Sequence, residues 1–219
     1  MRTPPADFPP EPWHLGGSML STVWKVDAAE ARAQVTPYLP DGVQPVTVGR
    51  RAFVLTAFVR YEPGSVLSYD ELLVAVVTRR GLKPVTTIPQ IWVDNPASVA
   101  GGRTLWGIPK HLAAFEQTWG RTITGTASAD GVTLASVRAT QGLSLPGWRR
   151  VPLPNAHRLD GRTTFADVQA LGRLHLARAA WRIPADSPLA WITRGEPSIS
   201  LALRDMTIRF GPSERPVGA

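Results

Sequence analysis

Lys110 follows a proline within a stretch that carries little charge, Gly101-Gly102-Arg103-Thr104-Leu105-Trp106-Gly107-Ile108-Pro109-Lys110-His111. Because apolar Trp106 and Ile108 precede it, we expect its amine to be partly shielded from water. Loss of water disfavours the charged form of a lysine and lowers its pKa, by as much as ~3–5 units when burial is complete. A neutral amine can attack a ketone, and the resulting iminium accepts electrons from a breaking bond. The alternative interpretation is an exposed lysine after a turn.

Glu71 is the second residue whose position could serve chemistry. It begins the run Glu71–Thr78, which is otherwise apolar and rich in β-branched residues, as expected for a strand buried on both faces. A carboxylate inside a cavity can move protons, whereas one at a solvent-exposed strand end cannot serve a buried site.

Composition narrows the classes of protein that fit. The 219 residues contain no cysteine, which excludes disulfides, thiolate metal sites and thiol nucleophiles. The histidines lack metal-ligand spacing, so we expect no metal. The N-terminus lacks the apolar core of a signal peptide, and no apolar run approaches the ~20 residues of a membrane span, so we expect a cytoplasmic protein with no membrane partner.

The net charge of +7 leaves a basic nucleic-acid-binding domain as one hypothesis, which salt-dependent binding would support. However, the chain has only three lysines, its arginines are scattered, and no recognised nucleic-acid-binding motif accompanies them. We therefore expect no nucleic-acid partner.

Periodicity and turn residues predict one mainly β domain with a few short helices, an α+β arrangement. Asp27 and Glu30 form a capping box at the start of a helix that Pro37 ends. Residues 96–107 read as a short helix or irregular segment, because two glycines disfavour a long helix. Residues 165–180 fit a helix as well as a strand. Expected strands cover 23–26, 46–61, 71–78, 85–93, 115–119, 121–128, 132–140, 199–203 and 206–210. We divide the chain into a Pro-rich arm (1–12), a single domain (13–212) and a flexible tail (213–219).

Four pieces of the chain together resemble the acetoacetate decarboxylase family. They are Trp24-Lys25-Val26-Asp27 with Leu39-Pro40-Asp41-Gly42; Tyr69-Asp70-Glu71; Asp94-Asn95-Pro96-Ala97 with Gly102-Arg103 and Gly107-Ile108-Pro109-Lys110; and Ser187-Pro188-Leu189 with Ile208-Arg209-Phe210-Gly211-Pro212. The Gly-Arg and Gly-x-Pro-Lys pair is the most specific of them. The resemblance extends from about Trp13 to Pro212.

The resemblance implies a cone- or barrel-like antiparallel sheet around an apolar cavity, assembled into a homo-oligomer, with no cofactor. It also implies that Lys110 is the Schiff-base lysine and Glu71 the cavity glutamate. We therefore predict that the two residues share one cavity, although 39 residues separate them. The expected function is therefore a Schiff-base lyase that acts on a small keto acid. A non-catalytic protein that binds small molecules on the same fold is the alternative.

The chain departs from the family pattern around these two residues. His111 stands in place of a second lysine, Thr56 in place of a second cavity glutamate, Lys25 in place of an arginine, and Ile108 in place of a tyrosine. The substrate-binding candidates are Lys25, Arg103, Trp106, Ile108, Thr56 and His111, with Lys25 or Arg103 attracting a substrate carboxylate. Such altered surroundings leave decarboxylation, aldol and dehydration chemistry open. His111 can point away from Lys110, because adjacent residues of an extended segment face opposite sides.

Overall fold

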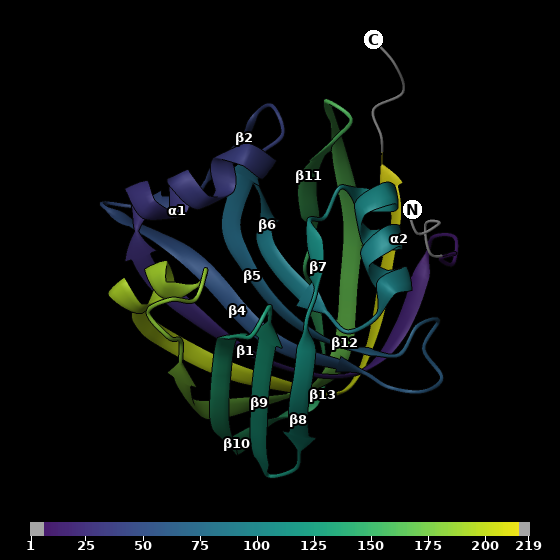
Figure 1. Cartoon of the computed structure of the whole chain (residues 1–219), viewed down its shortest axis with the longest axis vertical. Coiled ribbons are helices and arrows are strands. Elements are labelled where there is room, and N and C mark those ends of the chain that lie inside the picture. The colour runs from purple at the N-terminus through teal and green to yellow at the C-terminus, as the bar shows by residue number, and fades with distance from the viewer. Residues whose placement is uncertain (1–6, 215–219) are drawn as a thin grey trace.

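The computed structural model describes residues 7–214 and is built around one sheet of 13 strands (Figure 1). The described helices are α1 (Ala28–Val35), α2 (Pro96–Trp106) and the 3-10 helices η1 (Thr36–Tyr38) and η2 (Ala190–Arg194). The strands are β1 (Trp13–Asp27), β2 (Val43–Pro45), β3 (Thr47–Val48), β4 (Arg51–Tyr61), β5 (Tyr69–Arg80), β6 (Lys83–Val93), β7 (Lys110–Leu112), β8 (Ala114–Trp119), β9 (Thr122–Ala129), β10 (Val132–Pro152), β11 (Asn155–Leu159), β12 (Arg162–Arg182) and β13 (Glu196–Glu214). The expected mainly β fold with few short helices is confirmed.

Seven strands close into a ring in the order β6-β5-β4-β1-β13-β12-β11. The closing strand is β11, which pairs with β12 in antiparallel fashion and with β6 in parallel through Asn155 and Thr86. Beyond β12 the sheet continues through β10, β9 and β8, which form the lower wall in Figure 1. The sheet is therefore a partly closed barrel with an extension.

The two faces of the ring strands bury two separate hydrophobic cores. On β4, Ala57 and Val59 belong to a core inside the ring, while Val54 and Phe58 belong to a core between the ring and the extension. This division follows from the two-residue period of a strand, which sends neighbouring side chains to opposite faces. A shift of one residue in position on a strand therefore moves a side chain from one core to the other.

Most expected elements match the structure. Asp27 is the N-cap of α1, where its carboxylate accepts hydrogen bonds from the backbone N–H groups of Ala29 and Glu30. Helix α2 has 11 residues and continues through Gly101 and Gly102 before Gly107 ends it in a left-handed conformation with φ 68°. The ambiguous segment 165–180 lies within strand β12. The two strands expected near the C-terminus form one long strand, β13.

The expected arm and tail fall partly on residues that the structure does not describe. Strand β13 ends at Glu214, and residues 1–6 of the expected arm and 215–219 of the expected tail lie outside the described residues. No helix within residues 7–214 is long and apolar enough to cross a membrane.

Candidate functional site

Lys110 enters the interior of the ring from the short strand β7. This strand runs parallel to β6, with Lys110 beside Ile91 and His111 beside Trp92. Lys110 is only 4% exposed, whereas His111 is exposed on the opposite face, as the strand period predicts.

Three oxygen atoms surround the amine of Lys110. Its Nζ donates hydrogen bonds to Glu71 Oε2 at 3.0 Å, to Tyr69 Oη at 3.2 Å and to Ser98 Oγ at 2.9 Å. All four residues are buried. Tyr69 and Glu71 point the same way because they are two residues apart on β5. A lysine ammonium has three N–H donors, so these three acceptors satisfy it completely.

Helix α2 supplies the third acceptor and the space for the lysine stem. Its N-cap, Asn95, accepts hydrogen bonds from the backbone N–H groups of Ala97 and Ser98, which holds the first turn in place. One turn later, a Cβ at Gly102 would lie 2.8 Å from Lys110 Cδ and 3.0 Å from Cε. Glycine at this position therefore lets the stem of Lys110 pass against the helix.

A cavity of about 70 Å³ lies beside the amine, inside the ring. Its walls are mostly apolar, and Glu71, Tyr69 and Tyr61 lie along it with Lys110. The other lining residues are Trp13, Leu15, Met19, Leu55, Val59, Leu73, Ala75, Thr86, Ile88, Ile91, Trp106, Ile108, Leu153, Asn155, Val168, Ile208 and Phe210. The reactive groups therefore face a small, carbon-lined space.

The electrostatics of Lys110 correct one expectation. Burial lowers the pKa of Lys110, but the charge of Glu71, with contributions from Tyr69, more than offsets it, and the pKa lies above its usual value of 10.5. The expectation that desolvation leaves Lys110 with a lowered pKa is therefore wrong, because it omitted the ion pair. Burial also raises the pKa of Tyr69, so its phenol keeps its proton at neutral pH.

Two of the six substrate-binding candidates, Trp106 and Ile108, line the cavity. Lys25, Arg103 and His111 are exposed and are not part of the lining. His111 faces outward, where partial burial and the charge of Arg103 lower its pKa. The positive charges expected to hold a substrate carboxylate thus lie outside the cavity.

Thr56 is buried on the other face of β4. It accepts a hydrogen bond from Trp24 Nε1 at 2.9 Å, in the core between the ring and the extension. Its neighbour Leu55 faces the cavity instead. The sequence comparison thus identified the correct strand, β4, but it selected Thr56, which is one residue from Leu55 and faces away from the cavity.

Sequence reasoning missed several groups in or beside the cavity. Tyr69 could have been found by extending the strand predicted over 71–78 by two residues, which places Tyr69 on the same face as Glu71. Ser98 precedes Gly102 by four residues, which places both on one face of a helix. Thr86 and Asn155 line the cavity where β6 meets β11, and no local pattern predicts that pairing. Within residues 7–214, no group of three or more histidine or acidic side chains could hold a metal ion.

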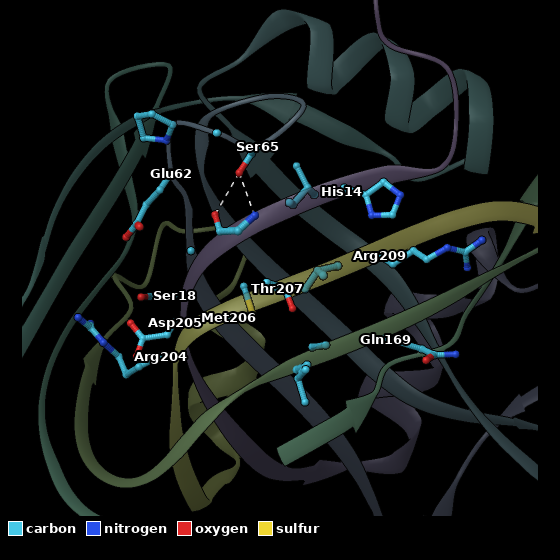
Figure 2. Close-up of a pocket in the computed structure, with 18 of the residues that line it drawn as sticks. His14, Ser18, Glu62, Ser65, Gln169, Arg204, Asp205, Met206, Thr207 and Arg209 are labelled. Carbon is cyan, nitrogen blue, oxygen red and sulfur yellow. Dashed lines mark hydrogen bonds between the residues drawn. The ribbon is translucent and has the colours of Figure 1, made fainter. Parts of the chain in front are cut away.

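A second, wider hollow lies on the outside of the ring, and we call it the outer groove. It has a volume of about 660 Å³ and runs across β1, β12 and β13, next to the loop that carries Glu62 and Ser65 (Figure 2). Ser65 Oγ accepts a hydrogen bond from Gly16 N–H and donates one to Gly16 O. His14, Arg204 and Arg209 line the groove as well (Figure 2). Lys110 does not line the outer groove, and the described residues that line both hollows are Leu15 and Ile208.

Known proteins resemble this chain in sequence and in fold. The family model described as acetoacetate decarboxylase (ADC) matches residues 1–157. The acetoacetate decarboxylase from Legionella pneumophila subsp. pneumophila str. Philadelphia 1 has a similar structure, with a TM-score of 0.77 and 15% identity over 98% of this chain and 92% of that one.

Two further structures have the same fold. The enduracididine biosynthesis enzyme MppR complexed with pyruvate has a TM-score of 0.72 and 19% identity, over 96% of this chain and 92% of that one. An acetoacetate decarboxylase-like enzyme from Sphingomonas wittichii RW1 has a TM-score of 0.69 and 14% identity, over 93% and 92%. No curated protein matches the chain in sequence.

Proposed function

The chain belongs to the acetoacetate decarboxylase family, and we propose that it is a Schiff-base lyase that acts on a small keto acid through Lys110. The observation that carries this proposal is the buried Lys110 amine, hydrogen-bonded to Glu71 Oε2 at 3.0 Å beside a small apolar cavity. A lysine paired with a proton acceptor in a site that excludes water has the parts needed to form an imine.

The first step is transfer of a proton from Lys110 Nζ to Glu71 Oε2, which leaves a neutral amine and a neutral carboxylic acid. The nitrogen lone pair then attacks the ketone carbon. One proton then passes from the nitrogen to the former carbonyl oxygen, which gives a carbinolamine. The carbinolamine hydroxyl takes up a second proton and leaves as water, with Glu71 or the neutral phenol of Tyr69 as the donor. The product is an iminium between Lys110 and the substrate, which draws electrons from an adjacent bond.

The cavity volume supports a small substrate. A single bound water needs ~10–15 Å³ of such space, so about 70 Å³ corresponds to roughly five to seven water-sized atoms. Pyruvate and acetoacetate are of this size. MppR, which shares the fold, is complexed with pyruvate in one structure.

The charges along the cavity support loss of carbon dioxide from a β-keto acid. Among the described residues that line the cavity, Lys110 is the only cationic side chain, so the iminium itself is the counter-charge of a bound carboxylate. The carboxylate of Glu71, once it has returned its proton, would repel that group in a medium of low dielectric constant. When the carbon–carbon bond breaks, its electron pair passes to the iminium as an enamine, carbon dioxide leaves, and the repulsion ends. Aldol and dehydration chemistry would use the same iminium.

One observation favours the alternative of a non-catalytic binding protein. All three N–H donors of Lys110 have an acceptor and its pKa is raised, so the lysine rests as an ammonium. An ammonium has no lone pair with which to attack a carbonyl. In the binding alternative, a small polar compound would occupy the cavity without forming an adduct.

Borohydride trapping distinguishes the two functions. Protein incubated with pyruvate or acetoacetate and then reduced is read by intact mass and peptide mapping, with carbon dioxide release from acetoacetate followed in parallel. The proposal predicts one adduct, on Lys110. Binding without an adduct supports the alternative, and an adduct on Lys25 or Lys83 would refute the role of Lys110.

A further inference from the structure

Among the hydrogen-bond partners of the Lys110 amine within residues 7–214, Ser98 is the one that does not come from β5. Its Oγ lies 2.9 Å from Nζ, the shortest of the three contacts, and the residue is fully buried. The backbone N–H of Ser98 is bonded to the side chain of Asn95, so the hydroxyl is carried by a capped first turn. We propose that Ser98 is a positioning residue, which aims the reacting nitrogen and helps to set the pH at which Lys110 loses its proton.

The orientation of the nitrogen needs a contact from outside β5. Glu71 and Tyr69 lie two residues apart on that strand, so both pull the amine toward one wall. Ser98 pulls from helix α2, and with three acceptors the ammonium has a single staggered orientation. When the proton passes to Glu71, the contacts with Tyr69 and Ser98 keep the nitrogen in place, and its lone pair then lies on the side of Glu71, from which the proton left.

The hydroxyl of Ser98 also bears on the protonation of Lys110. Ser98 Oγ accepts a hydrogen bond from Lys110 Nζ, and the positive charge of the ammonium strengthens that bond. A hydrogen bond to the charged form of a group favours that form. Removal of the Ser98 hydroxyl should therefore make Lys110 easier to deprotonate. It should also leave the orientation of the Lys110 nitrogen less fixed.

The face of helix α2 that carries Ser98 is shaped for the lysine. Gly102 lies one turn further on, where a Cβ would come within 3.2 Å of Lys110 Cγ, Cδ and Cε. The helix thus accommodates the stem at Gly102 and holds the tip at Ser98. Two contacts along one side chain favour a specific support of Lys110 over a chance hydrogen bond.

The inference rests on the proposed function for its meaning in catalysis, but its effect on the amine can be measured without a substrate. Formaldehyde with cyanoborohydride methylates neutral amines, and peptide mapping reports each of the three lysines separately. Below the midpoint, the Ser98→Ala variant should methylate Lys110 about tenfold faster than the wild type, which corresponds to a midpoint about one pH unit lower. Exposed Lys25 and Lys83 are the internal references.

The same variant should form the pyruvate adduct on Lys110 several-fold more slowly than the wild type. Pyruvate is larger than formaldehyde, so the nitrogen must approach its carbonyl carbon at a fixed angle. General loosening of the fold would change both rates in the same direction. Ser98→Thr, which keeps the hydroxyl, should restore the wild-type midpoint. Ser21→Ala, which changes a buried serine outside the cavity lining, should leave both rates unchanged.

An unchanged methylation profile of Lys110 in a folded Ser98→Ala variant would overturn the inference. If that variant does not fold, Ser98→Cys, whose sulfur is a weak acceptor of similar size, is measured instead, with the same expected shift. Failure of the proposed function gives a different result: the wild type forms no pyruvate adduct, while the methylation midpoint still moves in the variant.

Discussion

The cavity inside the ring and the outer groove differ in volume, in the exposure of their charged side chains to water and in the strength of their ion pairs. The groove is much the larger, at about 660 Å³ against about 70 Å³, and residues of β1, β12 and β13 line it (Figure 2). Its Asp205 lies 3.7 Å from Arg173, and both side chains are more than half exposed. In the cavity, Lys110 and Glu71 are 3.0 Å apart with side chains only 5% and 4% exposed.

This difference teaches that solvent access, more than volume, decides where chemistry can occur. An exposed ion pair is screened by water and contributes ~0.2–1 kcal/mol at most. A buried pair interacts in a medium of much lower effective dielectric constant, so a single proton transfer changes the energy of the site strongly. Only in the cavity can a lysine, a glutamate and a carbonyl compound meet without competing water.

Replacing Lys110 is the change with the largest expected effect. Lys110→Ala should abolish the borohydride-dependent adduct and lower turnover of acetoacetate by about a thousandfold or more, because the nucleophile is gone. It should also destabilise the fold by about 3–5 kcal/mol, since Glu71 is left buried and unpaired. Intact mass, product release and chemical denaturation measure the three effects.

Two comparisons control that experiment. Lys25→Ala and Lys83→Ala remove the two exposed lysines and should leave adduct and turnover unchanged. A double variant, Lys110→Met with Glu71→Leu, should recover most of the lost stability without activity. Full turnover in Lys110→Ala would place the chemistry elsewhere, with the outer groove as the first candidate.

Glu71→Gln should have the next largest effect. It removes the negative charge that raises the pKa of Lys110 and leaves burial, which lowers it. The midpoint of Lys110 methylation should therefore move down by more than ~1 pH unit, which is ~1.4 kcal/mol. Carbon dioxide release should fall all the same, because the proton acceptor is lost. A variant with the wild-type midpoint would mean that the charge of Glu71 does not control Lys110.

Stability should respond to pH in the corresponding way. In the wild type the folded-state pKa of Lys110 lies above the unfolded value, so the ion pair contributes fully at neutral pH and is lost only as the pH rises through the folded pKa. In Glu71→Gln the order is reversed, and stability should increase with pH as the buried amine loses its charge. If this account is correct, the Lys110 pair makes no difference between the wild-type denaturation midpoints at pH 7 and pH 9, whereas the midpoint of Glu71→Gln is higher at pH 9 than at pH 7.

His157 is a further buried titratable residue, besides Lys110 and Glu71, whose burial should make stability depend on pH. It is two residues from Asn155 on β11, and burial lowers its pKa to about 3. The unfolded chain takes up a proton near pH 6.5, so stability should be constant above that pH and fall by about 1.4 kcal/mol per unit below it. At pH 5 the loss relative to pH 7 is about 2 kcal/mol. His157→Gln should flatten this slope in guanidinium denaturation, and an unchanged slope would assign it to other groups.

The smallest effect is expected in the outer groove. Arg209→Ala removes a charged side chain that lies in the groove and is absent from the cavity lining (Figure 2). Turnover, adduct formation and the pH midpoint of Lys110 should stay within twofold of the wild type. A loss comparable to that of Glu71→Gln would show that the groove belongs to the active site, and the comparison would fail.

The elements with strong local signals could be predicted from the sequence. The Asp27 cap of α1 and the buried strand that starts near Glu71 follow from short-range patterns. The meeting of Glu71 and Lys110 was reached through the spacing of a recognised family pattern, and the structure places the two side chains in contact. The lining role of Trp106 and Ile108 was anticipated in the same way.

The remaining features depend on contacts that local patterns do not encode. Closure of the ring through Asn155 and Thr86 is a pairing between distant segments. Thr56 was assigned to the site by counting along the chain, although only pairing register decides which face of β4 it occupies. The direction of the pKa shift of Lys110 could not be obtained from apolar neighbours alone, because it depends on a carboxylate 39 residues away.

The most direct test of the central claim, that Glu71 controls the charge of a buried Lys110, is a pH titration by NMR of protein labelled with ¹³C at the lysine Cε. The chain has only three lysines, so three signals are expected, and Lys110→Met identifies one of them. The account predicts that the Lys110 signal remains that of an ammonium up to pH 10.5 in the wild type and titrates more than one unit lower in Glu71→Gln. A Lys110 signal that titrates at the same pH in both proteins would contradict the account.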